Sequence, residues 1–128
     1  MIVLQDIADD VIAPICPKGS HLSTKTIGRG EKNICLEDHK DQEDFGIIST
    51  TNTINHRHLR LIINWTKNIS DTERISNDLY SALNAIKDTQ YSNFFIKFIS
   101  MDDIFPIDNK RNKEEVYSKI IDFEIYYE

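Results

Sequence analysis

The alternation of hydrophobic and polar residues predicts two long strands in the second half of the chain. The first covers Arg57 to Thr66, and its apolar face carries Leu59, Leu61, Ile63 and Trp65. The second is the C-terminal segment Glu115 to Glu128, whose apolar face carries Ile121, Phe123, Ile125 and Tyr127. Successive side chains of a strand point to opposite faces, so one face of each strand is expected to be buried. On the C-terminal strand, the other face is formed by Asp122, Glu124 and Tyr126 and is expected to meet water or a partner.

A helical pattern follows the first strand. Ser70 to Glu73 reads SDTE, a capping box in which the serine accepts from a backbone amide three residues on and the glutamate reaches back. The apolar positions behind it recur at helical spacing and are Ile75, Leu79, Ala82, Leu83 and Ile86. The positions expected to face water are Arg74, Asn77, Asp78, Ser81 and Asn84. This pattern predicts a helix that begins at Ser70 and packs on one side against a sheet.

Three shorter elements are also predicted. Met1 to Ala13 is expected to form a helix that Pro14 ends. Its apolar stripe consists of Ile2 or Val3, Ile7, Ala8 and Val11. Phe45 to Thr50 and Phe94 to Met101 are expected strands. A loop that contains Pro106 separates the second of these from the C-terminal strand, and these last two strands are expected to be antiparallel neighbours.

The hydrophobic periodicity is lost between Pro14 and Asp44. This segment is rich in glycine and acidic residues, and its one strand-like stretch is Asn33 to Leu36. Residues 17–44 are therefore expected to form a polar arm that acts in assembly rather than in folding. On this hypothesis, deletion of the arm leaves a folded monomer.

The order of these elements predicts the α+β class. We expect a mostly antiparallel four- to five-stranded sheet with two helices packed on one face. The 128 residues, 40% of them hydrophobic, suffice for one domain that spans residues 1–128. The side chains of Trp65, Leu79, Leu83 and Phe123 are expected to share its core.

The charge balance argues against tight binding to nucleic acid or anionic membranes. The chain has 15 Lys and Arg against 21 Asp and Glu, a net charge of −6, and a pI near 5.2. No apolar run approaches the roughly 18 residues of a membrane span, and the N-terminus lacks the positive region and apolar run that mark a secretory signal. We therefore expect a protein retained inside a cell, in which Cys16 and Cys35 are reduced.

Three groups of residues raise the question of a metal site. The first is the acidic run, with Glu37, Asp38, His39, Asp41, Glu43 and Asp44. Consecutive acids in a loop usually point apart into water, which disfavours a shared ion. His56 and His58 would lie on one side of a strand, but spacing identifies no third ligand. The two cysteines match no zinc-ligand spacing with His21 or His39. No metal and no other cofactor is expected.

Catalytic motifs are missing from the sequence as well. It contains no Gly-x-Ser-x-Gly elbow, no phosphate-binding loop and no glycine fingerprint after a strand. A catalytic pair of carboxylates cannot be selected from 21 acids without a pocket to rank them. We therefore expect that the protein is not an enzyme.

The order of elements in residues 57–128 is more specific. It consists of the strand HLRLIINW, the helix ISDTERISNDLYSALNAI, the strand FFIKFIS, a proline-containing loop and the terminal strand EVYSKIIDFEIYYE. The helix carries a Leu-Tyr-x-x-Leu face, made of Leu79, Tyr80 and Leu83. The terminal strand carries an acidic residue, an aromatic residue and an Ile-Tyr-Tyr group, made of Asp122, Phe123, Ile125, Tyr126 and Tyr127. In these features the chain resembles the tail terminator proteins of long-tailed bacteriophages, including the phage minor capsid protein family.

The resemblance implies a structural role in the virion. Copies of the chain would form a ring, typically a hexamer, that caps the tail tube and joins it to the head-side connector. The candidate interface residues are Asp122, Glu124, Tyr126, Glu37, Asp38 and Asp41. The protein would be made in the cytoplasm of a bacterial host and end in the virion tail, and an acidic inner wall would let DNA pass without binding it. Two alternatives stay open: a head–tail connector component, and a non-viral α+β module that binds a ligand or a protein.

Overall fold

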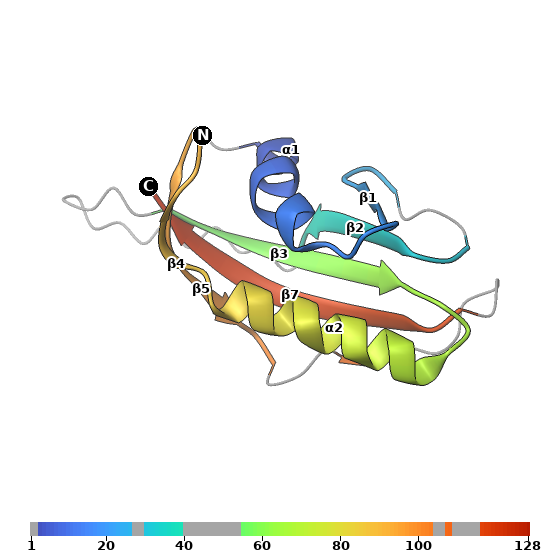
Figure 1. The fold of residues 1–128 in the computed structure, drawn as a ribbon. Helices are drawn as coiled ribbons and strands as arrows, with labels where there is room; N and C mark the ends of the chain where they lie inside the picture. The colour runs from blue at the N-terminus through green and yellow to red at the C-terminus, as the bar shows by residue number, and fades with distance from the viewer. Residues whose placement is uncertain (1–2, 27–29, 40–54, 104–106, 109–115) are drawn as a thin grey trace.

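The structure is a computed structural model of the chain that describes residues 3–26, 30–39, 55–103, 107–108 and 116–128. Within these ranges, the protein has the predicted α+β class, with helical segments and one curled sheet (Figure 1). The predicted strand Phe45–Thr50 lies outside the described residues. In the described ranges we find no helix with the length and hydrophobicity that a membrane crossing requires.

The N-terminal helical segment is continuous but irregular. It consists of α1 (Leu4–Ile7), the π-helix η1 (Ala8–Ile12) and the 3-10 helix η2 (Ala13–Ile15). Its buried side chains include the predicted Ile7, Ala8 and Val11 and also Ile12, while Ile2 lies outside the described residues. Val3 caps α1 and is 52% exposed. The segment runs through Pro14 instead of ending before it, because a proline in the first turn of a helix loses no intrahelical hydrogen bond.

Helix α2 (Ile69–Asn84) is present, but its N-cap is Asn68 and not Ser70. The backbone of Asn68 is extended, and its side-chain oxygen accepts a hydrogen bond from the amide of Asp71 at 3.1 Å. The hydroxyl of Thr72 donates to the carbonyl of Asn68 at 3.0 Å, so Asn68 accepts hydrogen bonds from the first turn through both its side chain and its backbone. Ser70 lies exposed inside the turn. Asparagine is as good a cap as serine, and it comes earlier in the chain.

One face of α2 is buried, as its period predicts. Its fully buried side chains are Thr72, Ser76, Leu79 and Leu83, while Ile75 and Ala82 are half-buried. All five positions predicted to face water are exposed. The sequence pattern therefore identified the packing face of α2 but not its two small buried hydroxyl residues, Thr72 and Ser76.

The sheet contains seven strands among the described residues, more than the four or five predicted. The strands are β1 (His21–Ser23), β2 (Asn33–Asp38), β3 (Asn55–Asn64), β4 (Lys87–Gln90), β5 (Phe95–Met101), β6 (Ile107–Asp108) and β7 (Ser118–Tyr127). Their order is β1-β2-β3-β7-β5-β4, and β6 pairs with β7. The pair β1–β2 is parallel and the others are antiparallel, including β5–β7 as expected. The additional strands β1, β4 and β6 are too short to show a hydrophobic period.

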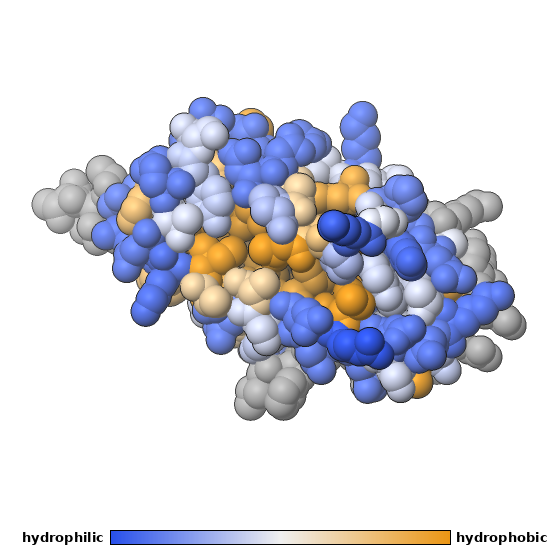
Figure 2. Space-filling model, viewed as in Figure 1, coloured by the Kyte–Doolittle hydropathy of each residue, from blue (hydrophilic) through white to orange (hydrophobic). Residues whose placement is uncertain are grey.

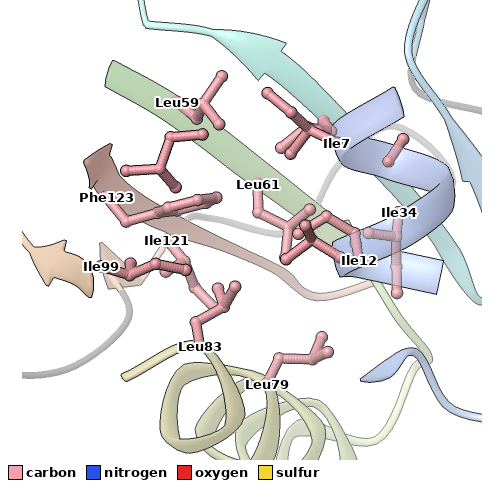
Figure 3. Packing of buried hydrophobic residues seen from close by; sticks show 14 of the residues in the cluster. Ile7, Ile12, Ile34, Leu59, Leu61, Leu79, Leu83, Ile99, Ile121 and Phe123 are labelled. Carbon is pink, nitrogen blue, oxygen red and sulfur yellow. The ribbon is translucent and has the colours of Figure 1, made fainter. Parts of the chain in front are cut away.

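A single hydrophobic core lies between the helical segments and one face of the sheet. Figure 3 shows Ile7 and Ile12, Leu79 and Leu83, and the side chains of the central strands converging on it. The predicted core residues Trp65, Leu79, Leu83 and Phe123 all belong to this cluster. Figure 2 shows hydrophobic residues gathered between the N-terminal helical segment and α2, with polar residues around them. The long neighbouring strands β3 and β7 run through the middle of the molecule (Figure 1).

The described part of the predicted polar arm belongs to this fold. Strand β2 pairs along its whole length with β3, and the side chains of Ile34 and Leu36 are fully buried in the core. Removing them would expose the neighbouring strand and take two large side chains from the core. We therefore correct the hypothesis that residues 17–44 do not contribute to folding.

Candidate functional site

The face of the sheet opposite the helices carries most of the chemically interesting side chains. Because Leu59, Leu61 and Phe123 enter the core, the residues between them point to the other face. Strand register places Arg60 opposite Asp122, His58 opposite Glu124, and His56 opposite Tyr126. On the far side of β7, Ser100 lies opposite Glu124 and Phe98 opposite Tyr126. We call this surface the polar face; its main members are His39, His56, His58, Arg60, Asp102, Asp122 and Glu124.

An ion pair lies at the centre of the polar face. Nε of Arg60 lies 2.8 Å from Oδ1 of Asp122, and Nη2 lies 3.2 Å from Oδ2, so the pair is bidentate. Nη2 of Arg60 also lies 3.1 Å from Nε2 of His39. The side chain of Asp122 is only 7% exposed, and a carboxylate at that depth requires such a partner. Asp122, predicted to contact a neighbouring molecule, is therefore engaged within the chain.

Two histidines are stacked beside this ion pair. The rings of His39 and His58 are parallel within 4°, with centroids 4.1 Å apart. Nε2 of His58 contacts a carboxylate oxygen of Asp102, which follows β5. The amide of Asp102 donates to the carbonyl of Asp122 at 3.1 Å, so the backbone sets this carboxylate beside the central ion pair. The stack thus joins residues just beyond the ends of β2 and β5 to His58 within β3.

Aromatic contacts continue the polar face toward the end of β7. Nδ1 of His56 lies 2.7 Å from Oε1 of Glu124, and its ring lies on Tyr126. Tyr126 in turn stacks on Phe98, with ring centroids 4.4 Å apart. Burial raises the pKa of Tyr126, and a hydrogen bond with Glu124 raises it further, so this phenol stays protonated at neutral pH. Phe98 is 47% exposed and, among the described residues, is the one large apolar side chain exposed on this face.

The geometry of the polar face argues against a metal centre. In the described residues, no three His, Cys, Asp or Glu side chains are grouped so that they could hold an ion. The guanidinium of Arg60 lies between His39 and Asp122, where a cation would be repelled. His56 and His58 do share one side of a strand, as predicted, but each is paired with its own carboxylate.

The remaining predicted site residues lie apart from this network. Asp38 is exposed and forms a bidentate pair with Arg57, at 2.7 and 2.9 Å, on the helix side of the sheet. Glu37 of β2 is half-buried and lies opposite Arg60 of β3, while Asp41 lies outside the described residues. Both cysteines are free: Cys16 packs against the core, and Cys35 is buried on the other side of the sheet.

Sequence reasoning did not find the participation of Arg60, His39 and Asp102. Arg60 was visible as a polar residue between core positions of a strand, and its register against Asp122 is the signal that was missing. His39 and Asp102 lie just beyond the ends of β2 and β5, where no periodicity marks them.

Comparison of the chain with models of known families, with curated proteins and with solved structures gave no match in any of the three.

Proposed function

We propose that the protein is a structural subunit of a long-tailed bacteriophage, a tail terminator that assembles into a ring and closes the tail tube. The observation that carries this proposal is the order of elements in residues 57–128. Strand β3 leads into a capped helix, and β5 and β7 follow as antiparallel neighbours, with β7 beside β3 at the centre of the sheet. This is the order on which the sequence resemblance rests.

The chemistry of the polar face supports a structural role over a catalytic one. Its charged side chains are paired across strands, as the contacts of Arg60, His58 and His56 illustrate. In these contacts the groups are directed at one another and hold neighbouring strands together. Cross-strand ion pairs of this kind fix strand register.

The two ends of the sheet support assembly into a ring. The sheet begins at β1 and ends at β4 and β5, so each subunit has two unlike edges. A contact between unlike patches is heterologous and produces a closed ring when the rotation between copies closes. The partners in this proposal are further copies of the chain, the tail tube protein and the head-side connector. The net charge of −6 fits a ring through which DNA passes without binding.

Native mass spectrometry of the purified protein, followed by binding to purified tail tubes, tests the proposal. We expect an assembly of six copies of the 14.9 kDa chain that attaches to tube ends. Attachment to connectors but not to tubes would favour the alternative of a connector component. A monomer at every concentration that binds neither structure would contradict a role in the phage tail.

A further inference from the structure

A cavity lies where strand β5 runs past the C-terminal half of α2. It has a volume of about 470 Å³ and is lined by Tyr80 and Asn84 of α2 and by residues 98–103 of β5 and its extension. Consecutive residues of a strand point to opposite faces, so a cavity lined by all of them opens on the strand's edge and not on a face of the sheet. The hydroxyl of Tyr80 donates to the carbonyl of Asp103 and fixes the end of this edge to the helix.

Among the described residues, the backbone of β5 has no strand partner on this edge beyond Phe98. Strand β4 pairs with β5 only as far as Phe98, and no described strand continues beyond it. The amide of Asp102 bonds to β7, so the alternation of an antiparallel ladder turns the N–H and C=O of Met101 away from β7 and toward the cavity. An unpaired edge of this kind accepts an extended backbone as an additional strand.

The charge at this edge is negative. Asp102 and Asp103 both line the cavity and are exposed, and no Lys or Arg lines it. Among the described residues, Asp103 has no ion-pair partner, while Asp102 contacts His58. An extended segment that carries a basic residue at its end would complement this edge.

The opposite edge of the same sheet has the complementary properties. Strand β1 is the terminal strand, and among the described residues only β2 pairs with it. Lys18 precedes β1 and Lys25 follows it, and both side chains are exposed. No described residue forms an ion pair with either lysine. Because the lysines flank β1 at both ends, one of them faces the Asp102–Asp103 end of β5 whichever way the strands run.

We propose that β1 of one copy adds to the free edge of β5 in the next copy, which joins the sheets of neighbouring subunits. This inference rests on the proposed ring and specifies its contact. Each copy then gives one edge and receives another, so the contact is heterologous and repeats around the ring. Main-chain hydrogen bonds hold the added strand, and the pair of a lysine with Asp103 selects it.

Charge reversal on each side separates this contact from other ways of assembling. Asp103→Lys, and separately Lys18→Glu with Lys25→Glu, should each weaken self-association in sedimentation velocity by at least about tenfold. Mixing the two proteins should restore assembly, because reversed and native contacts then alternate around the ring. Asp78→Lys on the exposed face of α2 and Lys67→Glu are matched controls that should assemble like the native chain. Circular dichroism checks that each variant is folded.

Each result distinguishes the contact from the ring itself. If the native protein assembles and both reversals leave assembly unchanged, the proposed contact is wrong while the ring stands. If both variants lose assembly and their mixture does not recover it, the two edges do not meet and the pairing is also wrong. A native protein that never assembles removes the proposed function together with this contact.

Discussion

The two faces of the central strands β3 and β7 differ in how they are stabilised. On the helix side, Leu61 and Phe123 are fully buried among apolar side chains. On the polar face, the preceding residue of each strand, Arg60 in β3 and Asp122 in β7, forms a bidentate ion pair with the other beside stacked histidines. The alternation of side chains along these strands thus produces an apolar core on one face of the sheet and a charged network on the other.

The apolar face supplies most of the folding stability, and the polar face helps to fix the register of β3 against β7. Apolar burial stabilises the fold in proportion to the area removed from water. A largely buried ion pair gains less, because desolvation offsets most of its attraction. A shift of β3 by one residue against β7 would put Arg60 into the core and Leu61 onto the polar face, so both faces oppose it. We therefore expect substitutions on the core face to lower the free energy of unfolding strongly. Substitutions on the polar face should lower it only when they remove one partner of an ion pair and leave the other.

The largest effect should come from the core face. Replacing Leu83 with Ala should lower the free energy of unfolding by about 2–5 kcal/mol, because it leaves a cavity beside the sheet. Urea denaturation measures the change, and Ser81→Ala on the exposed side of α2 is a matched control. A loss below about 0.5 kcal/mol for Leu83→Ala would refute the packing of α2 on this face.

The polar face should respond to single and double changes differently. Asp122→Ala should lower the free energy of unfolding by about 2 kcal/mol, because it removes the carboxylate that pairs with Arg60; the partial exposure of Arg60 keeps this loss below that of a fully buried pair. Arg60→Met combined with Asp122→Leu should unfold within about 1 kcal/mol of the native chain. If the double variant is as unstable as the single one, the ion pair contributes net stability and the contrast between the faces fails.

A defect in the core face offers a smaller gain. The hydroxyl of Ser76 is buried on α2 and has no hydrogen-bond partner among the described residues. Ser76→Ala removes this unsatisfied group and improves helix propensity, so it should raise the free energy of unfolding by about 1 kcal/mol. Calorimetry would show the gain as a higher melting temperature. An unchanged or lowered value would mean that the hydroxyl is satisfied.

The smallest effect concerns a thiol that packs against the core. Burial raises the pKa of Cys16 to about 11 from its ordinary value of 9.0, against a hydrogen bond with Ser20 that lowers it. Since the unfolded chain ionises first, the thiol's contribution to stability is complete below pH 9 and is lost as the pH rises through 11. Cys16→Ala should therefore lose less stability than the native chain across this interval. Parallel pH curves for the two proteins would show that Cys16 does not ionise differently on unfolding.

The sequence predicted the long elements well and the short ones poorly. Strands β3, β5 and β7 and the packing face of α2 follow from periodicity, because each buries one side over many residues. Strands β1, β4 and β6 have four residues or fewer, and backbone pairing with a neighbour defines them instead of side-chain pattern. The strand-like stretch Asn33–Leu36 is confirmed as part of β2, but the polarity of residues 17–44 concealed that Ile34 and Leu36 are buried in the core.

The candidate site was only partly predictable for a related reason. Asp122, Glu124 and Tyr126 could be assigned to one face from alternation within a single strand. Their partners come from other strands, and which residue faces which depends on register between distant segments; Arg60 and Asp122, for example, are 62 positions apart. Composition and spacing carry no information on that register. The free edge of β5 was equally invisible, because it depends on where β4 stops.

We propose above that the protein is a ring-forming subunit whose neighbouring sheets join edge to edge. Cryo-electron microscopy of the assembled protein is the decisive measurement, because it shows both the symmetry and the contact. We expect a closed ring in which β1 of each copy lies beside β5 of the next. A closed dimer held through the helix side of the sheet, or single particles of one chain at all concentrations, would contradict it.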